Sequence, residues 1–92
     1  MSLWTYILQS ATTGRLYCGS TDDCARRLLE HNDPDYHGSK TTKRFEGPWE
    51  LIWCENHLTR GHAMQREKQI KKRGIGRFLA EARSVESRAP RD

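Results

Sequence analysis

The chain has 92 residues, which is enough for one small domain and too few for two. Three Trp, three Tyr and two Phe argue against a disordered chain, although the hydrophobic fraction is only 35%. No stretch approaches the roughly 18–20 apolar residues needed to cross a bilayer, and the first residues lack a secretory pattern, so we expect no signal sequence and no membrane contact.

The net charge of +4 is unevenly distributed along the chain. Residues 60–83 contain eight Lys or Arg and only two Glu. Basic charge gathered in one segment predicts a polyanionic partner, most often nucleic acid. A solvated helix face is the alternative interpretation. Nothing in the sequence indicates an obligate protein partner.

The three cysteines are an odd number without CxxC spacing. A disulfide scaffold needs more cysteines, and in pairs. We therefore expect structural or incidental thiols in a reducing, cytoplasmic environment.

The first elements predict a β-hairpin followed by a helix. Residues 3–9 and 15–19 read as strands, separated by the turn cluster Ser10–Gly14. Side-chain oxygens in residues 20–23 can cap a helix that runs from about Asp22 to His31.

Residues 36–48 are polar, and we expect a loop with one short helix that starts near Ser39. Residues 49–55 then predict a third strand. A helix follows from Arg60 to about Lys72, ended by Gly74, and a closing helix spans 75–83. The result is one α/β domain over residues 1–83, with a flexible tail at 84–92. Its three-stranded antiparallel or mixed sheet is flanked by helices in the order β-β-α-α-β-α-α.

Glu67 is the first residue that departs from a purely structural pattern. It shares a helical stripe with Ala63 and Ile70. A carboxylate on an apolar stripe costs stability unless it is paired or binds a metal. An ion pair with Lys71, four residues further on, is the structural alternative.

Arg27 and His31 also stand four residues apart on one predicted helix face. Two cations side by side repel each other unless an anion lies near them, and a phosphate would suit. Two ordinary surface residues are the alternative.

Tyr6 and Tyr17 lie on the two hairpin strands. A tyrosine hydroxyl beside cations can lose its proton more easily than at its free pKa of about 10. Ordinary aromatic packing is the alternative.

Together these features resemble the GIY-YIG nuclease superfamily, and most closely its short, stand-alone bacterial YhbQ-like branch. The resemblance covers roughly residues 4–83. Four segments carry it: Trp4-Thr5-Tyr6, Tyr17-Cys18-Gly19, the stretch from Asp23 to His31, and the stretch from Arg66 to Lys72. Trp4 and Thr5 stand where the family has Gly and Ile, and Cys18 stands where it has Ile.

The resemblance implies a DNA endonuclease that uses one Mg²⁺ or Mn²⁺ to hydrolyse phosphodiester bonds, with a link to repair or recombination. Glu67 would bind the metal, and Arg27 would clamp a phosphate oxygen. Tyr6 would be the general base, with its pKa lowered by Arg27 and the metal, while Tyr17 orients the water and His31 assists proton transfer.

The nucleic-acid-binding candidates are six further cations: Lys40, Lys43, Arg44, Lys68, Lys71 and Lys72. For Gly19 we expect a positive φ at a sharp turn.

Two other function classes stay open at this stage. One is a non-catalytic nucleic-acid-binding module with the same fold. The other is a zinc-binding regulator that uses the cysteines and histidines, although no pair has CxxC or HxxxH spacing.

Overall fold

The computed structural model describes residues 3–33 and 48–88, and side chains as far as Ala82. Its strands and helices, in chain order, are β1 (Leu3–Ser10), β2 (Leu16–Thr21), α1 (Cys24–Asn32), β3 (Trp49–His57), α3 (Arg60–Arg73) and α4 (Ile75–Arg88). The short helix expected near Ser39, and Lys40, Lys43 and Arg44, lie outside the described residues.

The three strands form one sheet in the order β2-β1-β3, and both pairings are antiparallel. The predicted α/β fold with a small three-stranded sheet is therefore confirmed, and the sheet is antiparallel rather than mixed. Ile52 is an extra residue in β3, between the pairs Ile7–Trp53 and Leu8–Leu51. This irregularity bends β3 near its middle.

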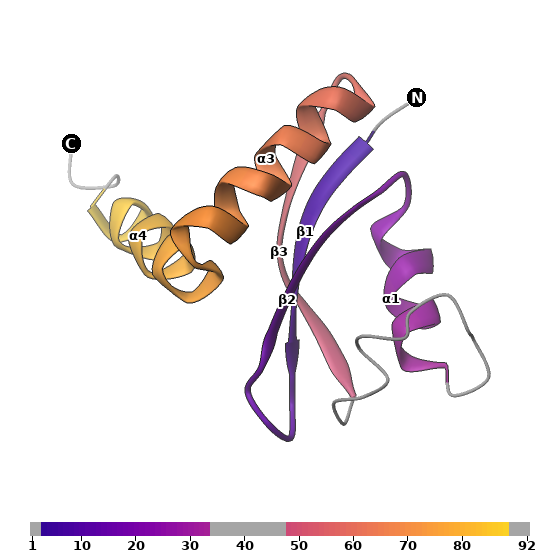
Figure 1. Ribbon diagram of the computed structural model, residues 1–92. Helices are drawn as coiled ribbons and strands as arrows, with labels where there is room; N and C mark the ends of the chain where they lie inside the picture. Colours follow the sequence, from indigo (N-terminus) through magenta and orange to yellow (C-terminus); the bar gives the residue numbers. More distant parts are fainter. Residues whose placement is uncertain (1–2, 34–47, 89–92) are drawn as a thin grey trace.

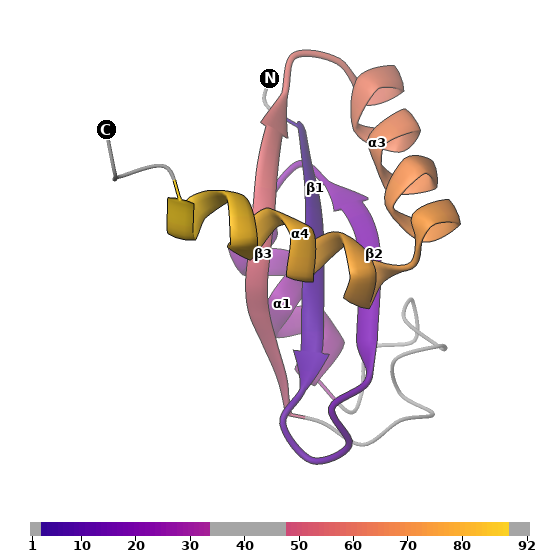
Figure 2. The ribbon, with the colours of Figure 1, turned by 90° about the vertical axis from the view of Figure 1, so that its left-hand side faces the viewer.

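Helices cover both faces of the sheet. Figure 1 and Figure 2 show α1 on one face, and α3 and α4 on the other. The central strand β1 is therefore almost wholly buried. None of the helices in the described ranges is both long and apolar enough to cross a membrane.

Each face of β1 contributes to a separate hydrophobic core, because successive side chains of a strand point to opposite faces. Ile7 packs with Cys18, Ile70 and Leu79 on the face covered by α3 and α4. On the α1 face the buried members are Tyr6, Leu8 and Trp49. The functional side chains therefore lie on a strand that is fixed from both sides.

The helix boundaries follow from local capping. Asp23 is the N-cap of α1, and its side chain accepts a hydrogen bond from the backbone N–H of Arg26 at 3.0 Å. Gly74, with a φ of 101°, ends α3 as predicted. The closing helix extends to Arg88, five residues beyond its expected end. Strands β2 and β3 each run two residues further than expected.

Candidate active site

Tyr6, Tyr17 and His31 form an aromatic cluster between the hairpin and α1. The antiparallel register sets Tyr17 opposite Leu8, so it shares a face of the sheet with Tyr6. The Tyr6 hydroxyl lies 3.0 Å from His31 Nε2, and both residues are buried. The ring centroids of Tyr17 and His31 are 5.0 Å apart. The fold thus brings together three predicted site residues from β1, β2 and α1.

Arg27 joins this cluster from the preceding turn of α1. Its Nη1 donates to Glu30 Oε1 at 2.9 Å, and its guanidinium also hydrogen-bonds to Tyr6. Partial burial opposes the charge, but these partners raise the pKa of Arg27 above its ordinary value. The anion expected beside Arg27 is therefore supplied by the protein itself, as the Glu30 carboxylate.

We expect Arg27 and a bound metal together to lower the pKa of Tyr6; Arg27 by itself does not do so. Burial raises the pKa of Tyr6 well above that of free tyrosine, and the neighbouring Tyr17 raises it further. The hydrogen bond and charge of Arg27 act in the opposite direction but are outweighed. Tyr6, only 2% exposed, therefore keeps its proton at neutral pH.

Gly19 has a different role from the one expected. Among the described glycines only Gly14 and Gly74 have a positive φ, so Gly19 does not mark a left-handed turn. It lies opposite Tyr6 in the sheet, and a Cβ at this position would be 2.7 Å from the Tyr6 hydroxyl oxygen. A glycine is needed here because the Tyr6 ring occupies the space of a side chain.

Glu67 projects from α3 toward the end of β2. Its Oε1 accepts a hydrogen bond from the Ser20 hydroxyl at 2.7 Å, and its Oε2 accepts one from Lys71 Nζ at 2.6 Å. The ion pair with Lys71, proposed above as the structural alternative, is therefore present. Glu67 is 22% exposed at its side chain, so it lies at the border between the packed face and solvent.

Ser20 is a site residue that the sequence reasoning missed as a partner of Glu67. Its hydroxyl also approaches the carbonyl oxygen of Ala63 at 3.4 Å, and Thr5 Oγ1 donates to the same carbonyl at 2.8 Å. These contacts fix the first half of α3 against β1 and β2. The spacing of the sequence gives no sign of them, since the partners are more than 40 residues apart.

The site has two halves, the aromatic cluster and Glu67, which lie on opposite faces of the sheet. Both halves contact β2, the first at Gly19 and the second at Ser20. Tyr6 faces α1, whereas Glu67 lies on α3. The negative charge of Glu67 is nevertheless close enough to contribute to the raised pKa of Tyr6. Because β2 is an edge strand, a substrate at this edge could reach both halves.

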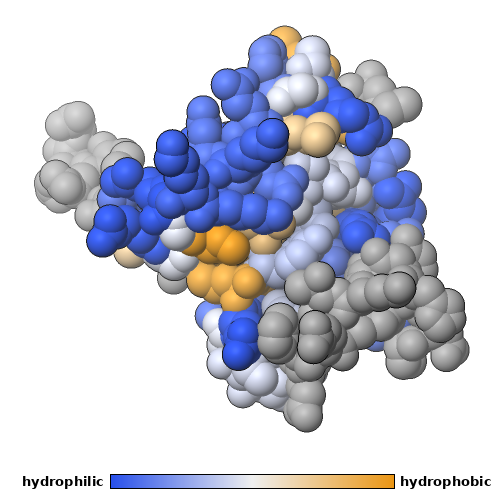
Figure 3. All heavy atoms as spheres, in the orientation of Figure 1, coloured by the Kyte–Doolittle hydropathy of each residue, from blue (hydrophilic) through white to orange (hydrophobic). Residues whose placement is uncertain are grey.

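Hydrophilic residues cover the outer surface of α3 (Figure 3). Lys68 and Lys72 are exposed there, whereas Lys71 is paired with Glu67. Partial burial opposes the charge of Lys71, but the hydrogen bond to Glu67 raises the pKa of Lys71 above that of free lysine. Of the predicted nucleic-acid-binding residues, Lys68 and Lys72 are therefore accessible to a ligand from solution.

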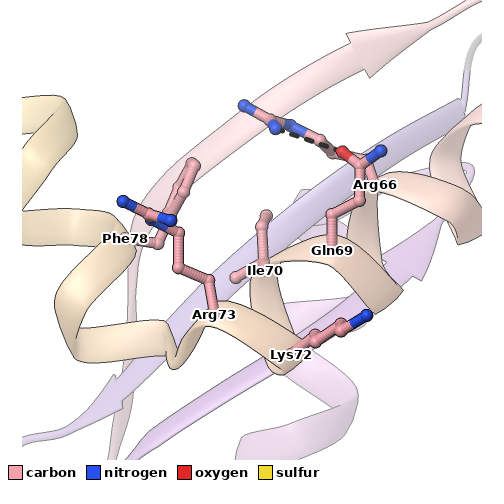
Figure 4. Close-up of a pocket in the computed structure, with 6 residues that line it drawn as sticks. All are labelled: Arg66, Gln69, Ile70, Lys72, Arg73 and Phe78. Atoms are coloured by element: carbon pink, nitrogen blue, oxygen red, sulfur yellow. Dashed lines mark hydrogen bonds between the residues drawn. The ribbon is translucent and has the colours of Figure 1, made fainter.

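A separate hollow of about 510 Å³ lies between α3 and α4 (Figure 4). Its lining residues are Arg66, Gln69, Ile70, Lys72, Arg73 and Phe78. Arg66 donates to Glu55 at 2.9 Å and lies 5.0 Å from the centre of the Phe78 ring, and Arg73 pairs with Glu81. Both arginines therefore have partners within the fold, and the hollow does not include the tyrosine cluster.

Comparison with known proteins identifies the family. Residues 2–74 match the GIY-YIG catalytic domain. The match spans most of the chain, and the chain therefore belongs to the GIY-YIG family.

The chain is also similar to individual bacterial proteins. The chain is 35% identical to a UPF0213 protein of Staphylococcus epidermidis over 68 residues, which are 74% of this chain and 78% of that protein. It is 41% identical to a UPF0213 protein of Bacillus pumilus over 66 residues, 72% of this chain and 63% of that protein.

A third relative is the structure-specific endonuclease subunit slx1 of Aspergillus terreus, 38% identical over 65 residues. These residues are 67% of this chain but only 17% of the fungal protein.

A solved structure supports the fold. The solution NMR structure of the UPF0213 protein BH0048 from Bacillus halodurans superimposes with a TM-score of 0.50 at 22% identity. The superposition covers 99% of this chain and 89% of that one.

Proposed function

We propose that the protein is a metal-dependent endonuclease that hydrolyses phosphodiester bonds in DNA and acts in the cytoplasm. One observation carries the proposal: the Tyr6–His31 hydrogen bond lies within the segment that matches a catalytic domain, with Arg27 beside it. A buried tyrosine–histidine pair next to a guanidinium is suited to moving a proton beside a phosphate.

The residues of α3 fit a single hard divalent ion. Among the described residues, no three of His, Cys, Asp and Glu gather as a metal centre. Mg²⁺, however, keeps most of its waters and takes one or two carboxylates, so Glu67 at the border of solvent is a sufficient protein ligand. Mg²⁺ or Mn²⁺ bound there would supply Lewis-acid polarisation of a phosphate oxygen.

The proton path is set by the pKa of Tyr6. Because Tyr6 holds its own proton, it can accept one from the attacking water only by passing its hydroxyl proton to His31 Nε2, 3.0 Å away. His31 must then be neutral and unprotonated at Nε2. Tyr17 packs against the imidazole and fixes its orientation.

Arg27 is the proposed phosphate clamp. Its guanidinium carries N–H donors in a planar fork whose geometry suits phosphate oxygens, and it lies beside Tyr6 and Glu30. Such a group can stabilise a non-bridging oxygen where negative charge develops. Lys68 and Lys72, with Lys40, Lys43 and Arg44, are the proposed contacts to the rest of the DNA backbone.

A non-catalytic DNA-binding module is the second candidate. Two observations favour it: Tyr6 is almost fully buried, and both carboxylate oxygens of Glu67 are hydrogen-bonded within the protein. Such a module would keep the basic surface and bind DNA without cutting it.

Nicking of supercoiled plasmid with Mg²⁺ or Mn²⁺ separates the two candidates. Glu67→Gln should remove cleavage and leave DNA binding in EDTA nearly intact, because it removes the metal ligand and little of the basic surface. Glu50→Gln, at an exposed position on β3, is the matched control and should cleave like the wild type. Binding without cleavage by the wild type would favour the second candidate.

The substrate preference needs a separate panel. Plasmid, single strand, flap, four-way junction and RNA should be compared at one salt concentration, because phosphate contacts make affinity strongly salt-dependent. A preference for branched DNA would support a link to repair or recombination.

A further inference from the structure

Each oxygen of the Glu67 carboxylate accepts a hydrogen bond from the protein itself. Ser20 donates to one oxygen at 2.7 Å and Lys71 donates to the other at 2.6 Å. The two partners differ in how firmly they are held. Ser20 belongs to a strand of the sheet, whereas the Lys71 side chain is 49% exposed on the surface of α3.

We propose that the Lys71 ammonium occupies the cation position at Glu67 in the metal-free protein, so that a divalent ion must displace it. Ser20 remains in place and is the positioning residue that aims the carboxylate. This inference rests on the proposed function, since it takes Glu67 as the metal ligand.

Electrostatics makes the two occupants mutually exclusive. The ammonium and a divalent ion are both cations, and both would bind at Oε2, the Glu67 oxygen that is not bonded to Ser20. At contact distance two like charges repel strongly even in a partly solvated site. Lys71 therefore has to swing away before the ion can bind closely.

The displacement is feasible because the Glu67–Lys71 pair is only partly buried. Exposed ion pairs contribute little to stability, and a lysine side chain regains rotamer freedom when it is released. The hydrogen bond from Ser20 keeps Glu67 oriented while the second oxygen changes partner.

The test measures Mn²⁺ affinity without DNA, from the loss of the free-ion electron paramagnetic resonance signal. Lys71→Met should lower the Mn²⁺ dissociation constant by at least about threefold, because the competing cation is gone. Lys71→Arg keeps the charge and the pair, and should bind Mn²⁺ like the wild type.

The matched control is Lys72→Met, which removes the same charge from the same helix. Lys72 makes none of the hydrogen bonds to Glu67 found among the described residues. Its affinity should stay within about 1.5-fold of the wild type, because a solvated charge further away is screened. Thermal unfolding of each variant verifies the fold, and Lys71→Gln repeats the experiment with a polar side chain.

The outcomes distinguish the inference from the function on which it rests. If Glu67→Gln weakens Mn²⁺ binding at least about tenfold but Lys71→Met and Lys71→Gln bind no tighter than the wild type, the displacement idea is overturned and the metal ligand stands. An equal gain in Lys71→Met and Lys72→Met also overturns it, since only total charge would matter. Unchanged binding in Glu67→Gln overturns the metal assignment itself.

Discussion

Gly19 is the position where the structure makes its sharpest prediction about a small change. In Gly19→Ala the added methyl carbon would lie 2.7 Å from the hydroxyl oxygen and 2.9 Å from the Cζ of Tyr6. The Tyr6 ring cannot yield easily, because it packs against Tyr17 and its hydroxyl is bonded to His31. Either the ring or β2 has to shift.

The expected cost follows from two opposing effects. Overpacking a buried site costs about 1–3 kcal/mol. Replacing glycine also restricts the unfolded chain, which returns about 0.4–1 kcal/mol where the backbone tolerates alanine. We therefore expect Gly19→Ala to lower the free energy of unfolding by about 1–2 kcal/mol, and to disturb the Tyr6–His31 hydrogen bond on which the proposed proton transfer depends.

Urea unfolding at pH 7.5, followed by tryptophan fluorescence, measures this loss. Gly61→Ala is the control: a Cβ at Gly61 meets only Thr59 Oγ1, at 3.8 Å, so this helical substitution should be neutral or stabilising by up to about 1 kcal/mol. If Gly19→Ala is as stable as Gly61→Ala and cleaves DNA at the wild-type rate, the placement of the Tyr6 ring against β2 is refuted.

Four further outcomes are expected. Tyr6→Phe should slow cleavage by about 10²–10⁴-fold, the usual size of general-base catalysis, and Tyr17→Phe should slow it less. Single-turnover cleavage rates measure both effects. The reverse order would make Tyr17 the base. Arg27→Ala should lower turnover more than DNA affinity, because the guanidinium acts where negative charge develops. Equal losses would mean that Arg27 contacts the phosphate equally well in the ground state and the transition state.

Burial raises the pKa of the Cys18 thiol to about 12. The protonated thiol therefore makes its full contribution to the free energy of unfolding below pH 9, and this contribution is lost as the pH rises toward 12. Between pH 8 and 10.5 the wild type should lose about 2 kcal/mol more than Cys18→Ala in urea unfolding, and parallel curves would contradict this. Finally, DNA affinity should fall with a log–log salt slope of roughly −4 to −5 if about four to six phosphates are contacted; a flat dependence would mean that the basic face is only solvated.

The sequence by itself determined the elements and their class. The aromatic and β-branched residues along positions 3–9 predict a strand, and Gly74 predicts the end of a helix, because both signals are local. Tyr6, Arg27, His31 and Glu67 could be singled out from residue type and spacing, and from the resemblance that these motifs carry.

The tertiary structure decided how these residues act. The Tyr6–His31 bond joins positions 25 residues apart and the Ser20–Glu67 bond joins positions 47 residues apart, so both depend on strand order and register. The direction of the Tyr6 pKa shift likewise depends on how deeply the helices on both faces bury the central strand, and the role of Gly19 depends on the ring opposite it. Local sequence patterns do not contain such information, because desolvation and steric contact arise only when distant segments pack together.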